Sequence, residues 1–315
     1  MEAIDSSFVI DKKLARKRKW LGVARNRYLY LMIIPGVIFF IIFRYIPMGW
    51  LVIAFQNYQP FWGIRGSDWV GLQHFSRLFL EGNFTMLLRN TLALFGLGLL
   101  TFPLPIVLAL SLNAVKNKLF KSVVQTIVYI PHFMSWVIVV SMFMIILAVD
   151  GGLINESLAF FGFDRIPFLF SPQWARIVYI VQDTWKGIGW SSIIYLAAIT
   201  NVDTTLYEAA SMDGASRWRQ TWHVTLPAIR PTIVTLLILR VGSTLDIGFE
   251  HVFLLTNAMN RQVLDIFDTF VFRLGIQGGQ FSYATAVGLF RGVVGLILVV
   301  GANKLAKKLG EDGIY

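Results

Sequence analysis

The stretch EAASMDG at residues 208–214, with VTLP at 224–227 after it, is polar and lies between two long apolar segments. Thr205 and the glutamate three residues later have the spacing of a capping box, which predicts that a helix begins there. The glycine at the end of the stretch, Gly214, suits the left-handed backbone position that ends a helix. Ser216 can then cap a second helix. The pattern predicts two short helices joined at a glycine, in a loop at 201–231 on the membrane surface.

Composition indicates a membrane protein. Hydrophobic residues make up 56% of the 315-residue chain and charged residues only 15%, against about a quarter charged in soluble domains. The net charge of +10 does not indicate a nucleic-acid partner, because the basic residues lie beside apolar segments, where they set topology. The absence of cysteine excludes a disulfide framework, a thiol nucleophile and a thiolate metal site.

Six apolar segments are long enough to cross a bilayer, which takes about 20 residues in a helix. The segments are continuous rather than short and alternating, and lipid requires backbone hydrogen bonds within each segment, so we expect an all-α fold. The expected spans lie near 28–53, 91–113, 122–148, 174–199, 232–255 and 284–303. They form one domain, 28–303, between a basic tail at 1–27 and a short tail at 304–315.

The placement of lysine and arginine predicts the orientation. About 17 of these residues lie in the two tails and in the loops after the second and fourth spans, against about 7 in the other loops. The positive-inside rule then places both termini and the 201–231 loop in the cytoplasm.

Motifs of catalysis are absent from the sequence. It has no phosphate-binding GxxxxGK[ST] loop, no HExxH and no serine-nucleophile elbow. Its four histidines make no metal-ligand spacing. We therefore expect no catalytic residue, no metal and no cofactor on this chain, with any ATP and Mg²⁺ held by a separate subunit.

The polar loop resembles a known docking element. It has the pattern of the EAA loop in binding-protein-dependent ABC importers, which is E-A-A, three residues, G, nine residues, an aliphatic residue, one residue and L-P. Val224 takes the aliphatic position, which is usually held by isoleucine. In that family the loop docks the permease onto its ATPase. The resemblance assigns this coupling to Glu208, Ala209, Ala210, Asp213, Gly214, Arg217, Leu226 and Pro227.

Other stretches resemble the LplB-type sugar permeases of the MetI-like superfamily, which are relatives of the maltose permeases. These stretches are IAFQNY at 53–58, DTWKGIGW at 183–190, LRVG at 239–242, GFEHVFLL at 248–255 and GEDGIY at 310–315. The resemblance implies a MetI-like permease fold and a permease subunit of an oligosaccharide importer in the bacterial cytoplasmic membrane. It also implies two ATPase subunits, an extracytoplasmic solute-binding protein and a second homologous permease, in a heterodimer or, as an open alternative, a homodimer.

Polar side chains at membrane depth are candidates for a sugar path, because each charge there costs about 2.5–3.5 kcal/mol on insertion scales. Carboxylates suit sugar hydroxyls, and flat aromatic faces suit sugar rings. One helical stripe consists of Arg240, Ser243, Asp246 and Glu250. The leading candidates are Trp190, Asp246 and Glu250, followed by Trp185, Phe249, Asp183, Lys186 and Arg240.

Structural ion pairs are the alternative for these charges, and simple packing is the alternative for the tryptophans. Arg240 can pair with Asp246 or Glu250, and Asp183 can pair with Lys186 or Arg291. Two other functions also stay open: an ABC importer of a non-sugar solute, and a membrane scaffold or receptor whose amphipathic loop lies on lipid. The sequence does not name the sugar.

Overall fold

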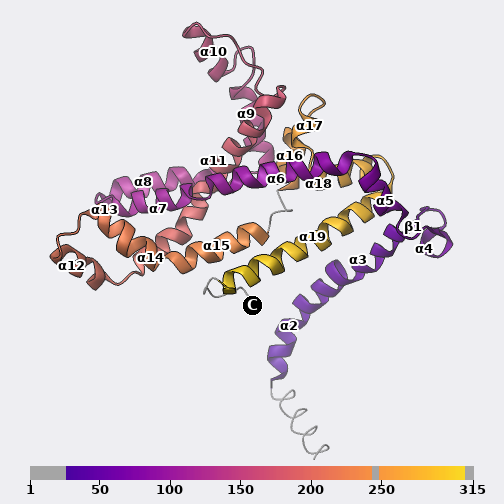
Figure 1. Ribbon diagram of the computed structural model, residues 1–315, viewed down its shortest axis with the longest axis horizontal. Coiled ribbons are helices and arrows are strands. Elements are labelled where there is room, and N and C mark those ends of the chain that lie inside the picture. The colour runs from indigo at the N-terminus through magenta and orange to yellow at the C-terminus, as the bar shows by residue number, and fades with distance from the viewer. Residues whose placement is uncertain (1–25, 243–247, 309–315) are drawn as a thin grey trace, which may run out of the picture. The chain divides into compact units, whose positions relative to one another are not determined.

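The computed structural model describes residues 26–242 and 248–308. Within them the chain is helical apart from loops and one antiparallel ribbon, β1 (Gln56–Asn57) with β2 (Asp68–Trp69), so the expected all-α fold is confirmed (Figure 1). The first helices are α2 (Arg27–Phe40), η1 (Ile41–Tyr45), α3 (Ile46–Met48), η2 (Gly49–Phe55), α4 (Gly63–Gly66), α5 (Gln73–Leu80), α6 (Asn83–Thr101), α7 (Leu104–Ala114), α8 (Lys118–Tyr129), η3 (Ile130–Phe133), α9 (Trp136–Ile146) and α10 (Leu153–Phe160). The others are α11 (Pro172–Thr200), α12 (Thr204–Met212), α13 (Arg217–Gln220), η4 (Thr221–Thr225), α14 (Leu226–Ala228), α15 (Arg230–Gly242), α16 (Phe249–Leu255), α17 (Arg261–Leu264), α18 (Phe267–Phe272), η5 (Arg273–Gln277) and α19 (Phe281–Lys308).

The chain divides into two units, at residues 1–53 and 54–315. The first contains a helical run that begins at Arg27 and ends at Phe55, just past the boundary, over 29 residues. At 1.5 Å per residue this run is longer than the roughly 30 Å hydrocarbon core of a bilayer. α2 has no buried residue, so its apolar surface suits contact with lipid.

Two further helical runs are long and apolar enough to cross a membrane, Asn83–Ala114 in α6 and α7 and Phe281–Gly301 in α19. The first begins before the expected 91–113 segment, and the second covers most of the expected 284–303 segment. α11 spans the expected 174–199 segment with 29 residues, but its charged and polar side chains make it less apolar than these runs.

The expected segment 122–148 is broken rather than one continuous helix. The run of α8 and η3 (Lys118–Phe133) and helix α9 are bent by 105°. Pro131 lies at the start of η3, and the backbone of Ser135 is extended. The Ser135 hydroxyl accepts a hydrogen bond from the Ile138 N–H at 3.3 Å, so a new N-cap starts α9 in a new direction.

The expected segment 232–255 is also not one helix. α15 is described as far as Gly242, and Gly248 precedes α16 with a left-handed φ of 76°. The sequence predicts that Glu250 continues the helical stripe of Arg240. That prediction is wrong, because the left-handed backbone of Gly248 interrupts a right-handed helix. Ser243 and Asp246 lie outside the described residues.

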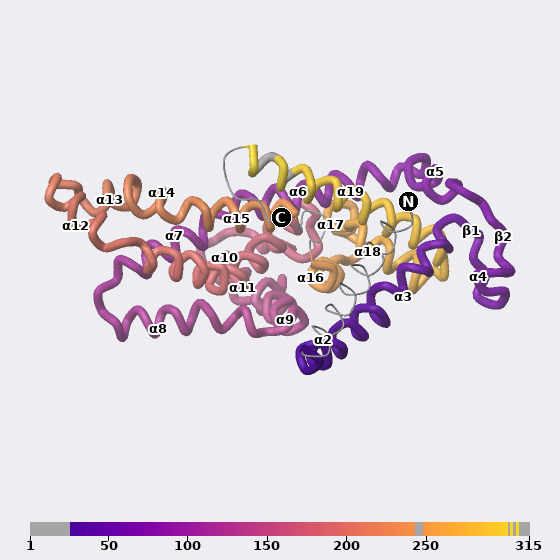
Figure 2. Tube along the Cα trace, turned by 90° about the horizontal axis from the view of Figure 1, so that it is seen from below, coloured from indigo at the N-terminus to yellow at the C-terminus, as the bar shows by residue number. Residues whose placement is uncertain are grey.

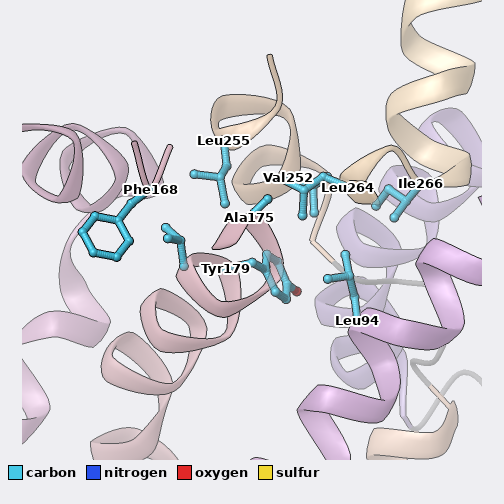
Figure 3. Packing of buried hydrophobic residues seen from close by; sticks show 9 residues of the cluster. Leu94, Phe168, Ala175, Tyr179, Val252, Leu255, Leu264 and Ile266 are labelled. Carbon is cyan, nitrogen blue, oxygen red and sulfur yellow. The ribbon is translucent and has the colours of Figure 1, made fainter. Parts of the chain in front are cut away.

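The largest buried core joins elements that are far apart in the sequence (Figure 3). Leu94 of α6 meets Ala175 and Tyr179 of α11, and Val252 and Leu255 of α16 complete the contact. Lipid is as apolar as these side chains, so close packing rather than escape from water holds such helices together. α11 is the central element, since it also packs against α7, α8 and α9.

Within the second unit, α12 and α13 lie at one end, and the β1–β2 ribbon with α5 lies at the other. Both views show this separation (Figures 1 and 2). The arrangement separates the polar loop predicted to face the cytoplasm from the loop that follows the first predicted span.

α11 crosses α8 at close range beside Gly189. A methyl group at this position would overlap the carbonyl oxygen of Val128, whereas the space beside Gly187 in the same helix is open. We expect Gly189→Ala to destabilise the purified protein by about 1–3 kcal/mol through overpacking, measured as a lower thermal unfolding temperature in detergent. Gly187→Ala is the matched control. Equal unfolding temperatures for the two variants would contradict this close crossing.

Candidate functional site

A cavity of about 360 Å³ lies between α6, α7, α11 and α15. Its wall includes three residues expected on the sugar path: Asp183, Trp190 and Arg240. Hydroxyl and aromatic groups line it as well, from Thr101, Thr184, Ser191, Phe102 and Tyr195. A few polar groups set in an apolar and aromatic wall are typical of pockets for small ligands.

An ion pair joins two helices at this cavity. Arg240 Nη2 of α15 lies 3.5 Å from Asp183 Oδ2 of α11. The guanidinium fits against Gly98 of α6, where a methyl group would overlap it. Arg291, considered from the sequence as a partner of Asp183, instead lies 2.5 Å from Asp268. The pairing of Asp183 therefore differs from both alternatives drawn from the sequence.

Trp190 presents an aromatic surface to the cavity. Its side chain is 45% exposed, and the His132 ring stacks on it with ring centroids 4.4 Å apart and an interplanar angle of 2°. Phe133 contacts the same indole edge-on at 5.9 Å. One face of the indole is thus covered by the turn between α8 and α9.

Lys186 does not line the cavity, although the sequence placed it on the sugar path. Its ammonium donates hydrogen bonds to three backbone carbonyl oxygens of the turn between α8 and α9. The partners are His132 at 2.7 Å, Met134 at 2.5 Å and Pro131 at 3.5 Å. The ion pair with Asp183 that the sequence allowed is therefore replaced by contacts with backbone.

Two other expected path residues lie in aromatic contacts away from the cavity lining. Trp185 meets Phe143 edge-on with centroids 5.9 Å apart. Phe249 stacks on Phe253 at 5.3 Å and contacts Phe272 at 5.1 Å. The contact of Trp185 corresponds to the packing alternative that the sequence left open for the tryptophans.

Glu250 lies exposed in the first turn of α16 and interacts electrostatically with Lys186 of α11. It is not part of the cavity lining. Asp246 falls outside the described residues, so its place on a sugar path stays a prediction.

His251 is a buried polar residue that the sequence did not single out. Its imidazole lies between the rings of Trp136, at 3.7 Å, and Tyr179, at 4.5 Å. Its Nε2 is 2.7 Å from Oε1 of Gln182. These partners belong to α9 and α11, so no local sequence pattern marks the contact.

The polar loop at 201–231 forms two short helices, as predicted, but the N-cap of the first is Asp203 rather than Thr205. The Asp203 carboxylate accepts a hydrogen bond from the Thr205 N–H at 2.9 Å, and α12 begins at Thr204. That hydrogen bond stabilises the charged carboxylate and lowers the pKa of Asp203. The predicted capping box at Thr205 is therefore wrong, because the carboxylate of Asp203, two residues earlier, accepts the hydrogen bond of the first turn instead.

Gly214 ends α12 as predicted, with a left-handed φ of 74°. The N–H groups of Gly214 and Ala215 donate to the carbonyls of Ser211 and Ala210, at 3.0 and 2.9 Å, which is the Schellman pattern. Ser216 then caps α13 by accepting from the Arg219 N–H. Backbone hydrogen bonds thus fix the end of α12, and a side-chain cap fixes the start of α13.

Side chains tie the two helices together and leave an open surface. Tyr207 and Thr225 hydroxyls lie 2.9 Å apart, and Gln220 donates to Ser211 Oγ at 2.9 Å. Met212 is 89% exposed, an unusual state for a large apolar side chain in a polar loop. Of the expected coupling residues, Ala210 and Leu226 are half-buried and the others are exposed: Glu208, Ala209, Asp213, Gly214, Arg217 and Pro227.

Within the described ranges, 26–242 and 248–308, no three His, Asp or Glu side chains come together as a metal site. The expectation that this chain holds no cofactor stays a prediction.

Comparison with known proteins gives consistent matches. A family model described as binding-protein-dependent transport system inner membrane component matches residues 101–310. The polygalacturonan/rhamnogalacturonan transport system permease protein YteP of Bacillus subtilis (strain 168) is 61% identical over 314 residues, covering 99% of this chain and 97% of that protein. Protein LplB of the same organism is 49% identical over 298 residues, covering 94% of each.

The fold also matches a solved transporter. In a crystal structure of a bacterial alginate ABC transporter in complex with an alginate pentasaccharide-bound periplasmic protein, one chain is 42% identical, with a TM-score of 0.88. The match covers 94% of this chain and 100% of that one. The resemblance to LplB-type permeases and the MetI-like fold expected from the sequence are confirmed.

Asp203 generates a prediction about the first turn of α12. Its lowered pKa means that its stabilising contribution is complete above the unfolded value of about 3.9 and is lost as pH falls through the lower folded value. At pH 7 we expect Asp203→Ala to speed amide hydrogen exchange in the first turn of α12, whereas Asp203→Asn, which keeps an acceptor, does not. Equal exchange rates in the alanine variant and the parent protein would refute this cap.

Proposed function

Because this chain belongs to the binding-protein-dependent transport system inner membrane components, we propose that it is the membrane-spanning subunit of an ATP-driven oligosaccharide importer. It resides in the bacterial cytoplasmic membrane and is not itself an enzyme. Two separate ATPase subunits bind ATP and Mg²⁺, and an extracytoplasmic binding protein delivers the sugar. A second, homologous permease completes the pathway as a heterodimer.

The observation that carries this proposal is the 61% identity to YteP over nearly the whole chain, because every described element of this protein then has a counterpart there. Polygalacturonan is a polymer of uronic acids, as alginate is. We therefore propose oligosaccharides that carry carboxylates as the substrate class. The cavity supports this assignment: the Arg240 guanidinium can hold a carboxylate, and the Trp190 indole can stack on the apolar face of a sugar ring.

Coupling follows from how the docking hairpin, residues 203–228, is connected to the cavity. α11 carries Asp183 and Trp190 and ends at Thr200, just before the hairpin. The second arm of the hairpin, Arg217–Ala228, leads into α15 with a bend of 61°, and α15 carries Arg240. A displacement of the hairpin therefore reaches two walls of the cavity through short helical connections.

In this proposal the ATPase pair grips the hairpin and pulls it when ATP closes the pair, which switches the cavity from inward- to outward-facing. ATP and sugar shift this equilibrium only by their different affinities for the two states. The exposed side chain of Met212 and the carboxylates of Glu208 and Asp213 form the surface offered to the ATPase.

The proposed orientation puts both termini and the hairpin in the cytoplasm. The distribution of lysine and arginine supports it. So does the position of the β1–β2 ribbon and α5 at the opposite end of the second unit from the hairpin (Figure 2), which suits an extracytoplasmic loop.

Purification of the membrane complex tests this function. The chain should co-purify with an ATPase whose hydrolysis rate rises when the cognate binding protein is added together with oligogalacturonides. Stimulation by an amino acid or another non-sugar solute would favour a different importer. Purification without any ATPase would favour the membrane scaffold.

Gly214 gives a prediction specific to coupling. Its left-handed backbone disfavours any L side chain by about 1–2 kcal/mol, with asparagine as the best tolerated, so Gly214→Val should distort the bend whereas Gly214→Asn should not. We expect Gly214→Val to reduce uptake roughly tenfold, the equivalent of about 1.4 kcal/mol, while membrane insertion stays normal. Normal uptake by the valine variant would count against the hairpin as the coupling element.

Trp190 gives a prediction specific to the cavity. Trp190→Ala removes the aromatic wall but leaves the hairpin untouched, so we expect slower uptake of oligogalacturonides and an unchanged yield of co-purified ATPase. Unchanged uptake would assign Trp190 to packing alone.

A further inference from the structure

The broken helix between α8 and α9 leaves backbone carbonyl groups without helical partners inside the expected span 122–148. Carbonyls at the end of a helix need a donor, and lipid supplies none. Lys186 provides it from the neighbouring helix: its ammonium donates to the carbonyls of His132 and Met134 at 2.7 and 2.5 Å. It also reaches the Pro131 carbonyl at 3.5 Å, which already accepts from the Met134 N–H at 3.2 Å. An ammonium has three donors, so these contacts use all of them.

Side chains of the same turn pack against a second residue on that face of α11. Trp190 follows Lys186 at the i, i+4 spacing of a helical face. Its indole is covered by the His132 ring at 4.4 Å and touched by Phe133 at 5.9 Å. One residue of α11 thus fixes the backbone of this turn, and the other stacks on its side chains.

The start of α9 is fixed as well. The Lys186 ammonium lies 5.3 Å from the centroid of the Trp136 ring, which is a cation–π distance. The Trp136 ring also stacks on His251 of α16, with ring centroids 3.7 Å apart. The start of α9, directly after the turn, is therefore held between α11 and α16.

We propose that Lys186 is a positioning residue for the sugar-binding wall of the cavity and does not touch the sugar. It holds the turn at residues 130–135 in place. The turn then fixes the position of the His132 ring, which supports Trp190. The indole then offers only the surface that His132 leaves uncovered, in one fixed orientation. This inference rests on the proposed function for its transport readout, and on the geometry alone for its structural readout.

Two measurements on the intact, reconstituted complex test it. The first is hydrogen exchange of the backbone amides in 130–136. Lys186→Met should speed this exchange about tenfold, Lys186→Arg should restore most of the protection, and Trp190→Ala should leave it close to the parent value, because the lysine acts on the turn and the turn acts on Trp190. Lys118→Met, which removes an exposed lysine from the first turn of α8, is the matched control and should change nothing.

The second measurement is a double-mutant cycle on the uptake of oligogalacturonides of defined length, presented by the cognate binding protein. We expect Trp190→Ala alone to take up the sugar at a rate roughly tenfold below the parent. If Lys186 acts through Trp190, the double variant Lys186→Met with Trp190→Ala should show the same uptake rate as Trp190→Ala alone. Independent action would multiply the two losses, to about a hundredfold. That product, or unchanged exchange in Lys186→Met, would overturn the proposal.

Failure of the proposed substrate is distinguishable from failure of this inference. A parent complex that takes up no oligogalacturonide contradicts the substrate class, and the exchange measurement then decides the role of Lys186. If Lys186→Met does not assemble, His132→Ala removes the supporting ring while keeping the carbonyl. It should slow uptake and be non-additive with Trp190→Ala, and additive losses would overturn the proposal.

Discussion

The hydrogen-bonding demand of backbone groups at membrane depth is the constraint on which the rest of the structure depends. A helix that stops inside lipid must find partners for its last carbonyls. The break after η3 is possible because Lys186 reaches it from α11 and because Ser135 caps the next helix. With the break satisfied in this way, α9 can turn away from α8, and the turn can support the aromatic wall of a cavity.

A second consequence concerns how motion reaches that cavity. Its ion pair joins α11 to α15, and these two helices flank the docking hairpin in the chain. The hairpin is stiffened at its start by the Asp203 cap, at its bend by the backbone hydrogen bonds of Gly214 and Ala215, and between its helical arms by the Tyr207–Thr225 contact. A stiff element between two cavity walls can transmit a force that a flexible loop would dissipate, which is the physical content of the proposed coupling.

Local features were predictable from the sequence, and contacts between distant elements were not. Gly214 and Ser216 occupy their predicted positions because a helix end is decided by its own few residues. The cap at Asp203 was missed, since a matching capping box follows directly after it. The charge of Lys186 is visible in the sequence and places it on the sugar path, while its carbonyl partners depend on a break 52 to 55 residues earlier. His251 and the Arg240–Asp183 pair likewise depend on which helices meet.

A single introduced cysteine tests the central claim most directly, because the chain has no cysteine of its own. Met212→Cys places a thiol at the exposed end of α12, and Phe61→Cys, at a residue that is 99% exposed, places one in the loop that follows β1. In the assembled complex a short bifunctional crosslinker should join position 212 to the ATPase subunit and should leave position 61 unattached to it. Crosslinking of position 61 to the ATPase, or free reaction of position 212 with a water-soluble maleimide in the full complex, would contradict the account.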